Sequence, residues 1–232
     1  MTLPPQPRQI RYRFTFPDGE TIVHVVRPQE EAPPQASSDW TLLGFHQCPN
    51  CPLSEREVKH CPFARALQAP VSLFGSRPSH MEVQVEVHYR GRTITQTTSL
   101  QRGASSLLGA IGATSGCPHT EFLRPMAWFH QPFNDDEETL LRAMSIYLLG
   151  QHLRMKRNLS ADWSLSGLQS AYRQLRIVNR SLAHRLRTAA EEDSNVNGLV
   201  LLDLLASTTI STLEKYEGEL DEYFSSYTKA NS

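Results

Sequence analysis

The stretch Met81–Ser99, "MEVQVEVHYRGRTITQTTS", decides the fold of the first half of this chain. Valines at 83, 85 and 87 alternate with the polar residues at 82, 84, 86 and 88. This period of two is typical of a β-strand with one buried face. Arg90 and Gly91 then predict a turn, and residues 93–98 predict the returning strand. The stretch therefore predicts a β-hairpin.

A second hairpin is predicted nearer the N-terminus. Ile10, Tyr12 and Phe14 alternate with polar residues, residues 17–19 read Pro-Asp-Gly, and residues 21–26 return. The segment between the hairpins contains residues 27–39, "RPQEEAPPQASSD", which have no hydrophobic period and predict an exposed linker. Residues 44–65 are rich in proline and cysteine, and we expect little regular structure there.

Helical periodicity begins at residue 134. Asn134 and Glu137 have the spacing of a capping box, and apolar stripes then predict helices over about 134–158, 164–192 and 196–227. The third stripe alternates steps of three and four, as in a helical hairpin or coiled coil, so these helices could also mediate self-association or bind a protein partner. The prediction is an α+β protein in which two β-hairpins with Pro/Cys-rich loops precede a three-helix antiparallel bundle. A β-rich half, residues 1–133, would thus be followed by a helical half, residues 134–232.

The two hairpins also share a sequence pattern. Each is followed by Leu-Leu-Gly, at 42–44 and 107–109, and then by Cys-Pro, at 48 and 117. This is either a decayed duplication or a coincidence between short motifs. A duplication with twofold symmetry would bring Cys48 and Cys117 together.

The chain has four cysteines, and a proline follows each of them. Their spacing is Cys48-x2-Cys51-x9-Cys61-x55-Cys117. A CxxC pair lets two sulfurs reach one metal from a single turn, and four thiolates are a common ligand set for zinc and for iron–sulfur clusters. Because cytosolic thiols are kept reduced, a metal centre is favoured over disulfides.

Zinc is the favoured metal, with a [4Fe-4S] cluster as the alternative and free thiols as the third possibility. His46, His60 and His119 each lie within two residues of a cysteine. With four thiols available, we expect these histidines to support the site or to lie on the surface. Pro52, directly after Cys51, disfavours a thioredoxin-like redox motif, in which the CxxC opens a helix.

The segments "FHQCPNCP" (45–52), "HCPF" (60–63) and "SGCPHTEFLRPMAWFHQPF" (115–133) resemble bacterial hypothetical proteins of an uncharacterised family. The resemblance covers most of the chain. It implies no activity, because none is assigned to that family.

Other functional classes have weaker support in the sequence. The net charge of −1 offers no field for nucleic acid or an anionic membrane, so we expect neither as a partner. The N-terminus has no apolar signal-peptide core, so we expect a cytoplasmic protein. A basic stripe on the second helix could bind phosphate, RNA or an acidic partner, although a solvated or salt-bridged helix face is the favoured interpretation. The stripe comprises Arg173, Arg176, Arg180, His184 and Arg187. No catalytic constellation is recognisable, so an enzyme would need a metal with an open position near His119 or His130.

Overall fold

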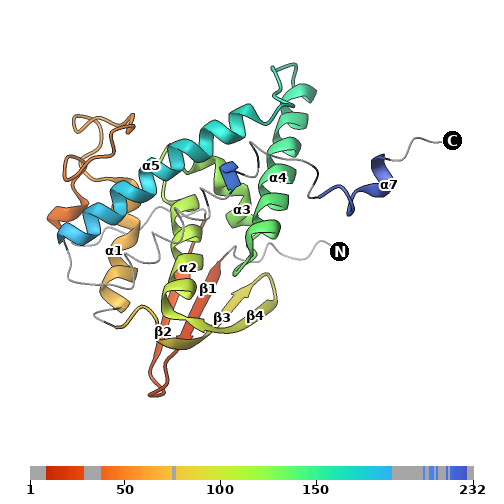
Figure 1. Ribbon diagram of the computed structural model, residues 1–232. Coiled ribbons are helices and arrows are strands. Elements are labelled where there is room, and N and C mark those ends of the chain that lie inside the picture. Colours follow the sequence, from red (N-terminus) through yellow and green to blue (C-terminus); the bar gives the residue numbers. More distant parts are fainter. Residues whose placement is uncertain are drawn as a thin grey trace, which may run out of the picture.

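The computed structural model describes residues 9–28, 38–74 and 77–189, together with 206, 209–211, 213, 218 and 220–228. Its β-sheet has four antiparallel strands in the order β2-β1-β3-β4, as Figure 1 shows. The strands are β1 (Ile10–Thr15), β2 (Thr21–Val26), β3 (Glu82–Tyr89) and β4 (Arg92–Ser99). Both predicted strand pairs are therefore present. The sequence did not predict that β1 also pairs with β3, with Phe14 opposite Val85, which joins the pairs into one sheet.

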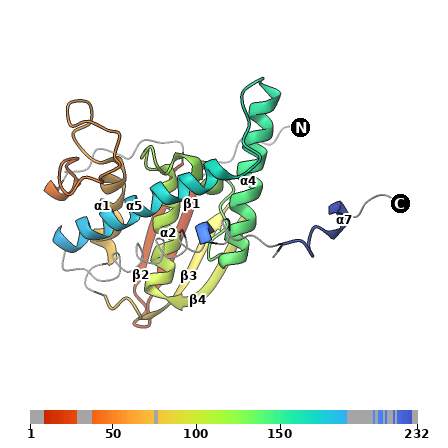
Figure 2. The same cartoon turned by 45° about the horizontal axis from the view of Figure 1, so that its top comes forward.

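One face of the sheet is buried under helices. The side chains of Tyr12, Phe14 and Val85 are fully buried, whereas Arg11 and Gln84, on the opposite face, are exposed. The alternation of apolar and polar residues in β1 and β3 thus arises, as predicted, because one face of each strand is buried. Figures 1 and 2 both show helix α2 (Leu100–Thr114) lying along this sheet, with helix α5 (Ser166–Ala189) running across the upper end of α2.

Helices α1 (Pro62–Phe74), α2 and α3 (Arg124–Trp128) were not predicted. Short 3-10 turns, η1 (Asp39–Thr41) and η2 (Glu121–Leu123), flank this region. The sequence of α2 contains Gly103, Gly109 and Gly112, which disfavour a helix in isolation. Packing explains two of them, because a Cβ on Gly103 would lie 2.9 Å from the Phe14 ring and one on Gly112 would lie 2.6 Å from the Phe63 ring. This helix therefore packs closely through its small residues.

The first two helices of the back half agree with prediction, as α4 (Asp136–Lys156) and α5. The capping box of α4 is one residue later than predicted: Asp135 accepts a hydrogen bond from the backbone of Glu138, and the Glu138 carboxylate accepts one from the backbone of Asp135. Asn134 is therefore not the cap. On α5, Val178, Leu182 and Leu186 belong to the sheet core, while Leu168, Tyr172 and Leu175 form a second core with Leu140 of α4.

The predicted third helix, 196–227, lies largely outside the described residues, and its continuity to residue 227 is wrong. Gly218 has a φ of +109°, a conformation that ends a right-handed helix. Residues 220–224 form turns, and the short α7 (Ser225–Thr228) follows, projecting away from the rest of the fold in both views. The three-helix bundle stays a prediction, as do the domain boundary at residue 133 and the linker, of which residues 29–37 are not described.

The duplication is not supported where it can be compared. Leu42 to Gly44 lie in a loop after η1, whereas Leu107 to Gly109 lie in the middle of α2. Within the described ranges, each helix is too short or too polar to span a bilayer.

Candidate functional site

The CxxC pair lies in a tight turn on the edge of the sheet core. The backbone N–H of Cys51 donates a hydrogen bond to the carbonyl oxygen of Cys48 at 3.0 Å. Pro49 fixes φ directly after Cys48 and stiffens this turn. The Asn50 side chain, between the two cysteines, donates to the carbonyl oxygen of Gln174 at 3.2 Å and to its side-chain oxygen at 2.8 Å. The turn is therefore held against α5.

Cys61 lies at the start of helix α1. Its carbonyl oxygen accepts from the backbone N–H of Arg65 at 2.9 Å, and its own N–H donates to the carbonyl of Thr41 at 2.8 Å. Pro62 is then the first helical residue, a position where its missing N–H costs nothing.

Cys117 lies in the loop after α2. Its backbone N–H donates to the Ser115 hydroxyl at 3.2 Å, and the Thr120 hydroxyl contacts its carbonyl at 3.1 Å and that of Gly112 at 2.6 Å. The His119 imidazole lies 2.6 Å from the carbonyl oxygen of Asn50. Since that oxygen can only accept, the histidine Nε2 carries the proton. The Cys117 loop is thereby joined to the CxxC turn, 69 residues earlier in the chain.

The four thiols are electrostatic neighbours. Burial raises the pKa of Cys117 to about 11, and negative charge on any of the other three cysteines would raise it further. Burial also raises the pKa of Cys48, and Cys61 and Cys51 act in the same direction. Without a cation, the thiols of Cys48 and Cys117 are therefore protonated at neutral pH. Cys61 is buried and the other three are partly buried against the same core.

Arg185 is a buried charged residue beside this cluster. Its side chain is only 1% exposed, and its guanidinium donates to the carbonyl oxygens of Trp40, Leu42 and Leu43. Burial lowers the pKa of Arg185, and the cysteines at 61, 48 and 51 oppose this effect. No carboxylate among the described residues pairs with it. A buried guanidinium of this kind favours negative charge beside it.

The histidines near the cysteines have other hydrogen-bond partners. The Nδ1 atom of His60 lies 2.9 Å from the Thr41 hydroxyl, and the His46 ring packs edge-on against the ring of His184. His130 lies elsewhere, 2.7 Å from the Tyr12 hydroxyl. Within the part of the chain that the structure describes, no group of three or more Cys, His, Asp or Glu side chains is arranged to hold a metal ion.

Sequence reasoning missed Arg185. The spacing of Arg185 could have identified it. Arg185 follows the buried Val178 and Leu182 by seven and three residues, so it lies on the buried face of α5. The predicted basic stripe lies on the same helix. Arg173, Arg176 and Arg180 each have an interaction partner, and whether this helix face is salt-bridged stays a prediction.

A family model described as "Domain of unknown function (DUF6901)" matches residues 10–225. The chain belongs to this family. No curated protein and no solved structure matches it.

Proposed function

We propose that this member of the DUF6901 family binds one metal ion through Cys48, Cys51, Cys61 and Cys117, with zinc as the metal. The observation that carries the proposal is the buried Arg185 beside the cysteine cluster, which has backbone carbonyls but no carboxylate as partners among the described residues. Four thiolates around Zn²⁺ carry a net charge of about −2. The guanidinium would offset part of that charge, and the metal-bound thiolates would supply the anion that a buried arginine favours.

Ligand binding would require the thiol side chains to turn toward a common point. Rotation about the Cα–Cβ bond moves a cysteine sulfur between staggered positions and leaves the backbone in place. The backbone around the cysteines is already fixed by the Cys48–Cys51 turn, by α1 and by the contact between His119 and Asn50. Metal binding would release the protons that the buried thiols hold.

The role we propose for the metal is structural. Residues 42–60 contain no helix and only one isolated bridge, Leu42 to His60, yet Leu42 and Asn50 are hydrogen-bonded to α5. A shared metal ion would connect Cys48 and Cys51 of this segment to Cys117 in the loop after α2. This role suits a regulatory or protein-interaction protein of the reducing cytoplasm, where thiols stay available for a metal.

Elemental analysis of anaerobically purified protein tests the proposal. We expect one zinc per chain and a colourless solution. Co²⁺ exchanged for zinc should give the intense visible absorption of tetrahedral thiolate coordination. A brown protein that contains iron and sulfide would show that the cysteines hold an iron–sulfur cluster and not zinc. Folded protein without bound metal, before and after incubation with zinc, would overturn the proposal.

Variants identify the ligands. Cys51→Ser and Cys117→Ser should each lower the zinc content and the melting temperature. His60→Gln is the matched control, because this histidine neighbours Cys61 but is hydrogen-bonded to Thr41. It should leave one zinc per chain. Loss of zinc from His60→Gln with full retention in Cys117→Ser would assign the fourth ligand to histidine.

We also propose self-association as the protein interaction, through α4 and the C-terminal residues. Leu149 and Leu153 follow one another at helical spacing on α4 and are 59% and 51% exposed. Tyr227 on α7 is also exposed. Sedimentation equilibrium should show a dimer that Leu149→Glu and Leu153→Glu dissociate. A monomer at all concentrations would contradict self-association and would leave the metal proposal unaffected.

A further inference from the structure

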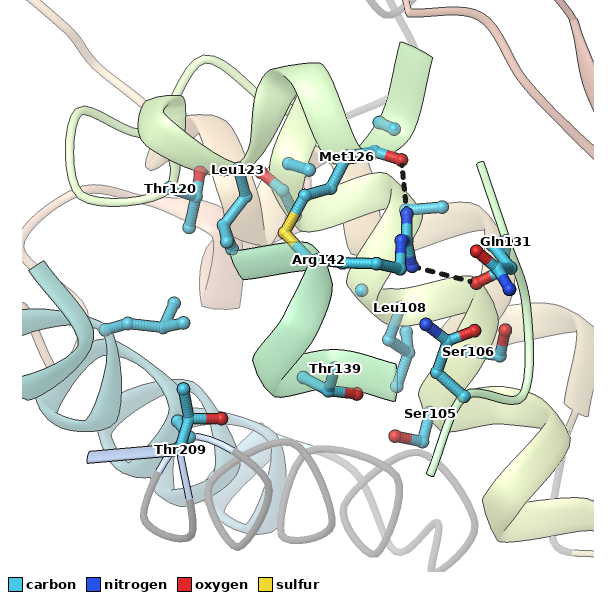
Figure 3. Close-up of a pocket in the computed structure, with 18 of the residues that line it drawn as sticks. Ser105, Ser106, Leu108, Thr120, Leu123, Met126, Gln131, Thr139, Arg142 and Thr209 are labelled. Carbon is cyan, nitrogen blue, oxygen red and sulfur yellow. Dashed lines mark hydrogen bonds between the residues drawn. The ribbon is translucent and has the colours of Figure 1, made fainter. Parts of the chain in front are cut away.

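A cavity of about 600 Å³ lies between helices α2, α3, α4 and α5, and none of the four cysteines lines it. Apolar side chains such as Leu108, Leu123 and Met126 form much of its wall. Figure 3 shows the hydroxyl residues Ser105 of α2 and Thr139 of α4 on its sides, with Thr209 on a third side. Its volume falls within the range of small-molecule sites, about 300–1,000 Å³.

Asn179 of α5 lies in this wall and, within the described part of the chain, has an unpaired hydrogen-bond donor. Its side chain is 2% exposed, and its amide nitrogen has no hydrogen-bond partner among the described residues. Buried polar groups in native proteins are nearly always paired, and an unpaired one destabilises the folded state. An amide donor held at a cavity wall is explained if a molecule in the cavity supplies the acceptor.

Charges of both signs line the cavity, Arg102 and Arg142 together with three carboxylates, and their near balance favours a neutral molecule. Figure 3 shows the Arg142 guanidinium bonded to the carbonyl oxygens of Met126 and Gln131, and it also donates to that of Phe129, each at 3.2 Å. Its donors are thus engaged by the end of α3 and the following loop. Three carboxylates at the start of α4, those of Asp135, Asp136 and Glu137, also line the cavity and would repel an anion.

We infer that this cavity binds a small, neutral, mostly apolar molecule whose carbonyl-type oxygen accepts a hydrogen bond from Asn179. The apolar wall would hold the body of the molecule, and Asn179 would fix its orientation. Such a division between many apolar contacts and few placed polar groups is typical of small-molecule sites. The molecule would contact none of the four proposed metal ligands, although Thr120 of the Cys117 loop borders the cavity.

Nile red tests the inference, since it is a neutral, largely apolar dye with a ring carbonyl and fluoresces strongly in apolar surroundings. We expect saturable binding of one dye per chain. Asn179→Leu should weaken binding about fivefold, the size of one hydrogen bond. The same substitution should raise the melting temperature of the dye-free protein, because it removes an unpaired buried amide. A purely structural role for Asn179 would instead lower that temperature.

Cavity-filling variants locate the dye. Thr139→Phe places a ring in the cavity and should abolish binding, whereas Ser145→Phe, on the exposed side of the same helix, should not change it. Circular dichroism verifies that both variants fold, and Thr139→Leu serves as a milder filling variant that should weaken binding. No saturable binding by the wild type would overturn the inference. The inference would also be overturned if the Thr139 variants or Asn179→Leu bound the dye as tightly as the wild type.

Discussion

The imidazole of His119 donates a hydrogen bond to the carbonyl oxygen of Asn50 and so connects the Cys117 loop to the turn between Cys48 and Cys51. The proposed metal centre depends on this contact, because it fixes the distance between ligands that lie far apart in sequence. Residues that orient metal ligands typically contribute 10- to 100-fold to metal affinity. His119→Ala should therefore lower zinc affinity about 10- to 100-fold, measured by competition with a chromogenic chelator.

His80→Ala is the control for this prediction, since His80 is exposed and remote from the cysteines in sequence. It should retain wild-type affinity. Unchanged zinc affinity in His119→Ala would show that the Cys117 loop reaches the metal without this contact.

Arg185 should contribute strongly to stability. Within the described ranges, Arg185→Met would leave the carbonyl oxygens of Trp40 and Leu43 without a donor, while that of Leu42 keeps the backbone N–H of Phe45 at 3.2 Å. Each unpaired buried group costs about 1–3 kcal/mol, so we expect a loss of about 3–5 kcal/mol in unfolding free energy, measured by urea denaturation. Arg187→Met, on the exposed face of the same helix, should change it by less than about 0.5 kcal/mol.

Arg185→Lys separates charge from geometry. Lysine keeps the positive charge but cannot present the planar set of donors that reaches several carbonyls. If charge compensation of the thiolates is the main role, the Arg185→Lys variant should retain zinc while losing stability. Equal loss of zinc in Arg185→Lys and Arg185→Met would assign the role to the carbonyl contacts alone.

Two glycines on helices should respond oppositely to alanine. A Cβ at Gly112 would lie 2.6 Å from the Phe63 ring, whereas one at Gly150 of α4 meets nothing within 4 Å. Gly112→Ala should destabilise the protein by about 1–3 kcal/mol through overpacking. Gly150→Ala should stabilise it by about 0.5–1 kcal/mol, because alanine is the better helix former. Thermal unfolding of both variants measures the difference, and a stabilised Gly112→Ala would show that α2 can move away from Phe63.

The same glycines explain which parts of the fold the sequence could predict. β1 and β3 have clear alternation because one face of each is buried, and α5 has a clear stripe because it packs on two cores. In α2, the signal is hidden by glycines whose purpose is to let Phe14, Val85 and Phe63 approach the helix backbone. That purpose is a tertiary contact and cannot be inferred from local propensity. The pairing of β1 with β3 is non-local in the same way.

The candidate site was likewise predictable only where the sequence pattern is local. The cysteines were identifiable from their motif and spacing, and whether they bind metal stays a prediction. Arg185 carries a charge on the buried face of α5, which makes it conspicuous only once that face is known to contact η1 and the following loop. Asn179 resembles any polar residue on a helix until the cavity beside it is known.

His130 should make stability depend on pH. Burial lowers its pKa from 6.5 to about 3, and the positive charge of Arg142 acts in the same direction. Below pH 6.5 the unfolded state takes up a proton that the folded state does not, so stability falls as the pH falls toward 3 and is fully present above 6.5. At 1.36 kcal/mol for each pKa unit, this residue should account for a loss of about 2 kcal/mol by about pH 5.

His130→Gln isolates this contribution, because glutamine can still hydrogen-bond the Tyr12 hydroxyl but does not titrate. Urea unfolding at about pH 7, 6 and 5 should show the variant losing about 2 kcal/mol less than the wild type over that interval. Zinc release and the other histidines affect both proteins alike, so the difference between the two curves is the measured quantity. Parallel curves would mean that His130 becomes protonated in the folded protein as readily as in the unfolded chain, through opening of its contact with Tyr12.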